Sequence, residues 1–245
     1  MSYVRSVFLS EELDSRSYLA KIPAVTALMR GERIPLDAPV TVFVGENGTG
    51  KSTLIEAIAV AYGFNPEGGT KNSNFSTEQS HSELWKHLTL VKGKRARDGF
   101  FLRAESFYNF ASNLDQLDRQ PAASPLLIKS YGGVSLHQQS HGESFLRLVQ
   151  YRFSGGGLYI LDEPEAALSP MRLLTLLAEI DQLVKADSQF IIATHSPILM
   201  AYPGARVLEL SEDGIRQVDY RETEHFRCSK DFYTDPDRMI HYLLK

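Results

Sequence analysis

The chain has little cysteine: Cys228 is the single one among 245 residues. One thiol excludes an intramolecular disulfide and a cysteine-rich zinc site, and such low cysteine usage suits a reducing compartment. We expect the side chain of Cys228 to serve as a small apolar filler.

The chain also lacks a long apolar run and an excess of positive charge. No stretch reaches the ~18 apolar residues that a membrane-spanning helix needs, and residues 1–5 contain no apolar signal core. We therefore expect a soluble, cytoplasmic protein without direct membrane insertion. A formal net charge of −4 gives no general signal for polyanion binding, so contact with nucleic acid would need a local basic patch.

The remaining composition suits one globular domain spanning residues 1–245, with 43% hydrophobic residues. Strand-like runs occur at residues 4–9, 40–44, 99–104, 158–161, 189–194 and 206–210. The runs at 158–161 and 190–193 are apolar throughout, which is typical of strands buried on both faces. Helical patterns lie between several runs, so the sequence predicts an α/β fold with a mainly parallel central sheet, flanking helices and an N-terminal antiparallel β portion.

Three segments between the strands have a recognisable character. Ser169 and Pro170 predict the start of a helix. Its buried face is predicted from apolar residues at helical spacing, namely Leu173, Leu174, Leu177, Ile180, Leu183 and Val184. Residues 64–82 are predicted to be a long polar loop, and residues 106–148 a small helical subdomain inserted into the sheet.

The strongest local pattern is a phosphate-binding loop. Residues 45–53 read Gly45-Glu46-Asn47-Gly48-Thr49-Gly50-Lys51-Ser52-Thr53, behind the apolar run at 40–44 and at the start of a good helix former. Glycines let successive backbone N–H groups close around phosphate oxygens, Lys51 reaches the β- and γ-phosphates, and the hydroxyl of Ser52 ligates Mg²⁺. The positive end of the following helix points at the anion. This segment predicts nucleotide binding.

A pair of carboxylates ends the apolar run at 158–161. Hydrolysis of a nucleotide needs a carboxylate that holds the metal and a group that orients the attacking water. Carboxylates at an apolar strand end are costly unless they are used or paired. Asp162 is therefore the candidate for holding Mg²⁺, and Glu163 is the candidate general base.

With both motifs in place, the chain resembles an ABC-type ATPase, the family that includes transporter nucleotide-binding subunits, recombination ATPases and many soluble AAA-domain ATPases. The resemblance implies ATP and Mg²⁺ as ligands. It places a D-loop at residues 165–169, and it makes His195, after the next apolar strand, the switch that contacts the γ-phosphate. It also implies a head-to-tail homodimer with two ATP molecules at the interface.

The signature loop of this family faces the nucleotide held by the other subunit, and its candidate here is residues 139–144. Ser140 and the N–H of Gly142 would donate to the phosphate. The segment departs from the family pattern Leu-Ser-Gly-Gly-Gln at Gln139, His141 and Glu143. A plain helix cap is the alternative interpretation.

The Q-loop of the family should end a strand and couple the helical subdomain to the metal. Glu105 follows the run at 99–104 and takes this place, as a candidate metal ligand. The alternative is an ordinary exposed carboxylate at a helix start.

These motifs do not reveal what ATP hydrolysis drives. The chain lacks the long coiled coil of chromosome-maintenance members, and its loop and switch look more like those of soluble recombination and phage-defence (OLD-like) ATPases. We therefore expect a soluble Mg²⁺-dependent ATPase with a role in DNA repair or phage defence. An ATP-binding transporter subunit is one alternative, and a nucleotide-gated switch that signals to a partner effector with negligible turnover is another.

A basic cluster is the candidate contact for DNA. Lys92, Lys94, Arg95 and Arg97 lie at a predicted hairpin tip, where they would meet a phosphate backbone. A solvated turn is the alternative.

Overall fold

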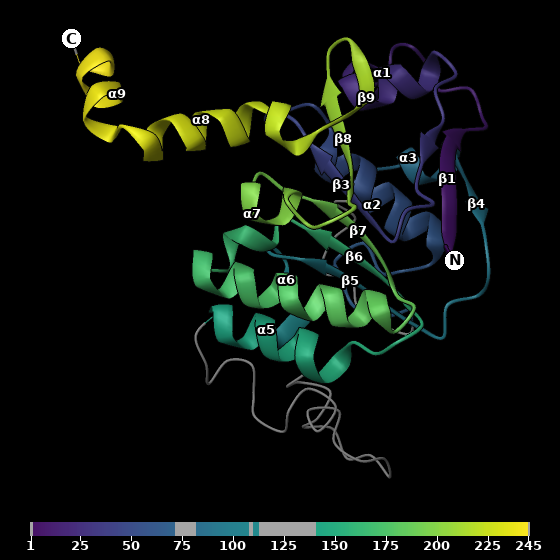
Figure 1. The fold of residues 1–245 in the computed structure, drawn as a ribbon. Helices are drawn as coiled ribbons and strands as arrows, with labels where there is room; N and C mark the ends of the chain where they lie inside the picture. Colours follow the sequence, from purple (N-terminus) through teal and green to yellow (C-terminus); the bar gives the residue numbers. More distant parts are fainter. Residues whose placement is uncertain (1, 72–81, 108–109, 113–140, 245) are drawn as a thin grey trace.

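The computed structural model describes residues 2–71, 82–107, 110–112 and 141–244, and its centre is a six-stranded sheet (Figure 1). The strands lie in the order β5 (Asp98–Arg103), β6 (Gly157–Asp162), β7 (Gln189–Ala193), β3 (Val40–Val44), β8 (Arg206–Ser211) and β9 (Gly214–Val218). All neighbours from β5 to β8 pair in parallel, and β9 returns antiparallel to β8. The predicted α/β fold with a mainly parallel sheet is confirmed.

Helices cover both faces of this sheet. Every residue of β3, β6 and β7 is buried, because each of these apolar strands packs on both sides. Helix α2 (Lys51–Tyr62) belongs to the apolar cluster on one face, and α5 (His141–Arg152) and α6 (Pro170–Lys185) belong to the cluster on the other (Figure 1). Because β3, β6 and β7 are neighbouring parallel strands, their carboxyl ends meet at one edge of the sheet, where the candidate nucleotide site lies.

The N-terminal antiparallel portion is a separate sheet. It contains β2 (Ile34–Pro35), β1 (Val4–Leu9) and β4 (Leu88–Lys92), in that order. Gln189, the first residue of β7, joins it to the main sheet. Its side-chain oxygen accepts from the backbone N–H groups of Tyr3 and Val4 at 2.7 and 3.0 Å, and its amide nitrogen donates to the carbonyl of Val4 at 2.9 Å.

Short helices link these parts. On the N-terminal side they are η1 (Tyr18–Lys21), α1 (Pro23–Met29) and α3 (Leu84–His87), and beyond β6 they are η4 (Pro164–Ala166) and α7 (Pro197–Met200). The chain then ends in η5 (Tyr220–Glu222), α8 (Glu224–Thr234) and α9 (Pro236–Leu243). Helices α8 and α9 project from the body as an arm (Figure 1), and none of their residues, all of which are described, is buried.

The predicted hairpin tip at residues 92–97 is wrong. Strand β4 pairs with β1 in the small sheet, whereas β5 pairs with β6 in the large one, so the segment crosses between two sheets. Lys94 forms an ion pair with Asp187, and the ammonium of Lys92 lies 5.3 Å from the ring centre of Tyr62. Two apolar runs that are close in sequence, as β4 and β5 are, resemble the two strands of a hairpin. Which strands pair depends on tertiary contacts, which the local sequence does not show.

Two further expectations need correction. Helix α6 begins at Pro170 as predicted, but Leu174 is 48% exposed and Leu176 is buried in its place. Successive helical residues are rotated by about 100°, and the buried stripe of α6 follows Leu173, Leu176 and Ile180, which leaves Leu174 beside it. Cys228 is exposed on α8 instead of filling the core, because α8 projects from the body and none of its residues is buried.

The two predicted inserts are described only in part. Of the loop predicted at 64–82, residues 72–81 lie outside the described residues. Gly69 forms an isolated antiparallel bridge with Phe101. Of the helical subdomain predicted at 106–148, residues 108–109 and 113–140 also lie outside them. Phe107, Phe110 and Ala111 are buried with α5 in one apolar cluster. The division into a domain with this insert stays a prediction.

Candidate nucleotide site

The loop between β3 and α2 has the backbone that a phosphate-binding loop needs. Gly45, Gly48 and Gly50 have φ angles of 141°, 86° and 95°, a region that favours glycine. A Cβ at Gly45 would lie 2.4 Å from the carbonyl oxygen of Leu210, and one at Gly50 would lie 2.3 Å from Ile22. Both glycines are therefore required by close packing as well as by backbone angle.

The side chain of Lys51 lies inside this loop. Its Nζ donates to the carbonyl oxygens of Gly45 and Glu46 at 2.9 and 3.0 Å, and only 4% of the residue is exposed. Burial lowers the pKa of Lys51, while the carboxylates of Glu163 and Asp162 act in the opposite direction. The ammonium thus lies against two carbonyls of the loop, from which it can turn toward a phosphate.

The other residues of the phosphate-binding loop differ in how far they are exposed to solvent. Thr49 is buried, and its hydroxyl donates to the carbonyl of Glu46 at 2.8 Å. Glu46, Asn47 and Gly48 are exposed at the outer turn of the loop, while Ser52 and Thr53 open α2 half-buried. The described residues offer no side chain that caps α2, so its first N–H groups face the site.

Asp162 ends β6 next to this helix. The residue is 5% exposed, the hydroxyl of Ser52 hydrogen-bonds to its carboxylate, and Oδ1 has no hydrogen-bond partner among the described residues. Burial raises the pKa of Asp162 to about 6, although Arg103 and Ser52 lower it. A carboxylate and a hydroxyl side by side are oxygen ligands of the kind that Mg²⁺ takes together with phosphate oxygens and water. The residues present therefore fit this metal.

Arg103 is a residue of the site that the sequence analysis missed. It ends β5 in register with Asp162, and its Nε lies 3.4 Å from Oδ2 of that residue. Its NH1 donates to Glu56 of α2 at 2.6 Å. The guanidinium therefore joins the phosphate-loop helix to the end of β6, and it occupies the strand-end position that we assigned to Glu105.

Glu105 lies near this cluster, at its exposed edge. Its carboxylate is 3.9 Å from NH2 of Arg103, and its side chain is 82% exposed. Its charge contributes to raising the pKa of Asp162, after the larger effects of burial and of Glu163. Arg103 could have been identified from the pairing of β5 with β6, because it is the last residue of β5 and lies opposite Asp162.

Glu163 and His195 face each other across the same edge. Glu163 has φ 49° and ψ 51°, a left-handed conformation that is uncommon for a non-glycine residue. Its Oε1 lies 3.7 Å from Nε2 of His195, which follows β7 and Thr194. Burial lowers the pKa of His195 to about 4, with smaller contributions from Lys51 and His225. At neutral pH the imidazole of His195 is uncharged.

Glu165 in the predicted D-loop holds this histidine in place. Its Oε1 accepts from the backbone N–H of His195 at 2.5 Å, and its Oε2 accepts from the hydroxyl of Thr194 at 2.7 Å. Burial raises the pKa of Glu165, and these two hydrogen bonds lower it. The sequence analysis placed Glu165 in a loop by position alone and did not predict this role.

His225 is the third residue that the sequence analysis missed. It lies on α8, and its Nε2 is 2.7 Å from Nδ1 of His195. We had singled out only His195 and His141 among the histidines, since nothing in the local sequence around His225 points to a nucleotide site. The side chain of His141 lies outside the described part.

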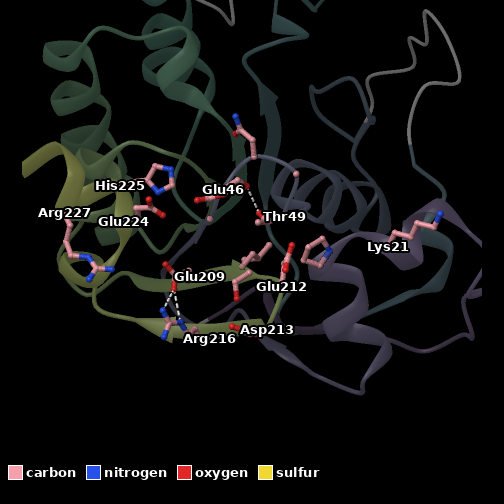
Figure 2. A pocket seen from close by; sticks show the side chains of 16 residues that line it. Lys21, Glu46, Thr49, Glu209, Glu212, Asp213, Arg216, Glu224, His225 and Arg227 are labelled. Carbon is pink, nitrogen blue, oxygen red and sulfur yellow. Dashed lines mark hydrogen bonds and ion pairs between the residues drawn. The ribbon is translucent and has the colours of Figure 1, made fainter. Parts of the chain in front are cut away.

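A cavity of about 700 Å³ lies on the outer side of the loop. It is bordered by the loop itself, by the turn between β8 and β9, and by the start of α8 (Figure 2). His225 and Glu224 lie on the side of the cavity next to Glu46 (Figure 2). The C-terminal arm therefore begins at the rim of the nucleotide site.

Only part of the predicted signature loop is described. Gln139 and Ser140 lie outside the described residues, and α5 begins at His141. Gly142 is buried against its own chain, because a Cβ there would lie 2.6 Å from Arg172 and 2.9 Å from the carbonyl oxygen of Ala167. The start of α5 is thus packed next to the D-loop, and the donor role of Gly142 stays a prediction.

The fold and this loop define a P-loop ATPase of the ABC type. The chain belongs to the family described as "AAA domain, putative AbiEii toxin, Type IV TA system", whose model matches residues 73–201. A second model, described as an AAA domain, matches residues 16–101.

Comparisons with individual proteins agree with this class. The chain is 25% identical over 171 residues to the ribose import ATP-binding protein of Bacillus cereus, a match covering 64% of this chain and 34% of that protein. It is 25% identical over 217 residues to an uncharacterized ABC transporter ATP-binding protein of Haemophilus influenzae, covering 81% and 80%. The chain thus spans about a third of the first relative and most of the second.

A comparison with solved structures agrees with the fold. A putative metal-chelate type ABC transporter in an inward-facing conformation aligns with a TM-score of 0.50 at 15% identity, over 94% of this chain and 88% of that one. In the part of the chain that the structure describes, no helix is both long enough and apolar enough to cross a membrane.

Proposed function

We propose that this chain binds Mg·ATP over the loop at 45–53 and hydrolyses it to ADP and phosphate. The observation that carries the proposal is the buried carboxylate of Asp162, whose Oδ1 has no partner among the described residues although Ser52 and Arg103 lie beside it. A buried carboxylate oxygen without a partner is costly unless a ligand takes it. A cation carried by a nucleotide supplies that partner.

Each residue of the site then has a role. Lys51 turns from the carbonyls of its loop to the β- and γ-phosphates, and backbone N–H groups from Gly45 to Thr53 surround them. Ser52 and Asp162 hold Mg²⁺, with Glu105 as a further proposed ligand at the exposed edge. When bound, the metal neutralises charge on the phosphates.

Glu163 accepts a proton from the attacking water, and the uncharged His195 donates a hydrogen bond to the γ-phosphate. Their separation of 3.7 Å supports this division of labour. Both groups also lie near the phosphate loop, because Glu163 opposes the lowering of the pKa of Lys51 by burial and Lys51 adds to the lowering of the pKa of His195 by burial. A general base contributes about 10²- to 10⁴-fold to a rate. Glu163→Gln should therefore bind ATP normally and release phosphate at least about 100-fold more slowly than wild type.

We further propose a head-to-tail homodimer with an ATP molecule at each of two sites. The outer turn of the phosphate loop is exposed at Glu46, Asn47 and Gly48, so one side of the nucleotide would stay open to water in a single copy. Ser140 and Gly142 of a second copy would close it. Dimer closure on ATP binding and release after hydrolysis is the resulting cycle.

The proposal for what ATP hydrolysis drives in this protein comes from the proteins that it resembles. The description of the matching family names a putative toxin of a type IV toxin–antitoxin system, which supports a stand-alone ATPase that acts on DNA or on a partner effector, in DNA repair or in phage defence. The alternative is an ATP-binding subunit of a transporter, which is favoured by the two curated relatives at 25% identity.

Two measurements test the proposal. Binding of a fluorescent ATP analogue should be lost in Lys51→Ala and kept in Glu163→Gln, and the latter should run as a dimer in size-exclusion chromatography with light scattering under saturating Mg·ATP. A monomer under those conditions contradicts the composite site.

Single-turnover hydrolysis separates the enzyme from a nucleotide-gated switch. The switch alternative requires equally low rates in wild type and Glu163→Gln, whereas a hydrolase requires the wild type to be faster.

A further inference from the structure

We infer that His225 is a positioning residue for His195: it selects the tautomer of the switch histidine and thereby makes the placement of the C-terminal helix α8 part of the catalytic geometry. The inference rests on the role of His195 proposed above. His225 lies on α8, an element that contains none of the sequence motifs of the nucleotide site.

The first observation is the geometry of the pair. Nδ1 of His195 and Nε2 of His225 are 2.7 Å apart, a distance at which one nitrogen donates and the other accepts. The other nitrogen of His195, Nε2, faces Oε1 of Glu163 at 3.7 Å. Each ring nitrogen of His195 therefore has a defined neighbour.

The second step assigns the proton. Burial lowers the pKa of both imidazoles, so each ring carries one proton at neutral pH. A proton on Nε2 of His195 suits a nitrogen that faces a carboxylate and the γ-phosphate position. With that tautomer Nδ1 is bare and must accept, so His225 donates from its Nε2. Without a donor at this place, His195 is free to carry its proton on Nδ1, where it is useless for phosphate binding.

The third observation is how α8 is held where His225 emerges. Thr223 is 1% exposed, accepts from the N–H of Phe226 at 3.4 Å as the cap of α8, and donates to the carbonyl of Tyr220 at 2.6 Å. Its hydroxyl also lies 3.7 Å from the sulfur of Met200, the last residue of α7. Helix α7 begins at Pro197, so the base of α8 is attached to the chain directly after the switch histidine.

The arm beyond this point has a different environment. Phe232, Tyr233, Ile240 and Tyr242 are between 38% and 80% exposed. His225, the second residue of α8, therefore lies at the junction between an anchored base and an exposed arm. A shift of α8 would break the imidazole pair before it disturbed the phosphate loop.

The test uses the full chain with His225→Leu, which removes the donor at similar volume, and His225→Gln, whose side-chain amide restores a donor. His241→Leu on the exposed arm is the matched control. The first readout is the ¹⁵N spectrum of the histidine rings in nucleotide-free protein, with the His195 signals assigned by their loss in His195→Gln. We expect Nε2 of His195 to carry the proton in wild type, in His225→Gln and in His241→Leu, and a tautomer mixture in His225→Leu.

The second readout is steady-state ATP hydrolysis together with the affinity for a fluorescent ATP analogue. Loss of a residue that orients a catalytic or ligating histidine typically costs about 10- to 100-fold. We expect kcat of His225→Leu to fall about tenfold or more, with recovery to within about threefold in His225→Gln and nucleotide affinity unchanged in all variants.

The possible outcomes distinguish a failure of the proposed ATPase function from a failure of the positioning role of His225. If wild type binds no ATP or does not hydrolyse it, the proposed function fails, and the ring spectra still decide the tautomer. If wild type hydrolyses ATP but His225→Leu keeps its rate and the Nε2 proton, the positioning role is wrong. A fall in kcat that His225→Gln does not recover also overturns it, because a hydrogen-bond donor at this position would then not be what the rate depends on.

Discussion

Strands β5 and β6 carry one cluster of charged side chains at each end, and the two clusters differ in how completely their polar atoms are paired. At the amino end, the carboxylate of Asp98 meets NH1 of Arg152 at 2.9 and 3.0 Å, the hydroxyl of Ser154 at 3.0 Å and that of Tyr159 at 2.9 Å. Burial raises the pKa of Tyr159, which keeps its hydroxyl protonated as a donor. This cluster is complete without a ligand.

At the carboxyl end the same two strands place Arg103 opposite Asp162. Oδ1 of Asp162 and Nε of Arg103 are buried and have no hydrogen-bond partner among the described residues. A folded chain satisfies buried polar groups wherever stability is the only requirement. The contrast indicates that the amino end contributes to stability, and it supports the proposal that the carboxyl end receives a bound group.

The largest expected effect tests the carboxyl end. In Asp162→Asn, ATP hydrolysis should fall about 100-fold or more, because stabilisation by a bound metal is worth several kcal/mol and each 1.4 kcal/mol is a factor of ten. Phosphate release measures the rate, and the thermal midpoint should be equal to or above that of wild type because a costly buried charge has been removed. A variant that unfolds but keeps its rate would reverse the assignment of the two ends.

The next effect tests the amino end. In Asp98→Ala, the free energy of unfolding should fall by about 2–3 kcal/mol, because the ion pair with Arg152 and the acceptor for the hydroxyls of Ser154 and Tyr159 are lost in a largely buried place. Urea unfolding measures the change. The rate of hydrolysis per folded molecule should match wild type, and a selective loss of activity would show that this cluster takes part in catalysis.

A smaller effect is expected in the pH dependence of stability. Burial raises the pKa of Asp162 to about 6 from an ordinary 3.8, so the folded state holds a proton that the unfolded state releases between these values. The contribution of Asp162 is therefore a loss of stability as pH rises from 4 to 6, about 2–3 kcal/mol in total. Unfolding of wild type and Asp162→Asn in metal-free and nucleotide-free buffer should diverge across this window, and parallel curves would contradict the shift.

The smallest effect concerns the basic segment at the amino end of β5. If DNA is bound there, glutamine at Lys92, Lys94, Arg95 and Arg97 should weaken binding about equally for all sequences, and it should reduce the salt dependence by about one unit per lost phosphate contact. Lys94 is already paired with Asp187, so most of the loss should come from the other three. A salt titration with labelled duplex measures it, and an unchanged slope shows that the segment is a solvated crossover.

Much of the fold could be predicted because it follows from local patterns. The apolar strands β3, β6 and β7 are buried on both faces, which their uninterrupted apolar residues indicated. Helix α6 begins at Pro170, whose fixed φ and missing N–H suit the first turn. The crossover at 92–97 was predicted wrongly because strand partners depend on contacts distant in the chain.

Of the residues in the candidate site, some could likewise be predicted from local sequence patterns and others could not. The phosphate loop, Asp162, Glu163 and His195 could be found because each follows an apolar strand, and the carboxyl ends of neighbouring parallel strands meet. Glu165 and His225 could not, since their contacts with His195 come from a loop and a helix some 30 residues away on either side.

By itself, the sequence determined the phosphate loop, the order of strands and helices that carries it, and the carboxylates at the end of β6, because these depend on residue type and local backbone. Only the tertiary structure decided which groups surround those carboxylates and the switch histidine. Arg103 reaches Asp162 through the pairing of β5 with β6, and His225 reaches His195 through the docking of α8 beside α7. Contacts of this kind arise from packing, which local periodicity does not encode.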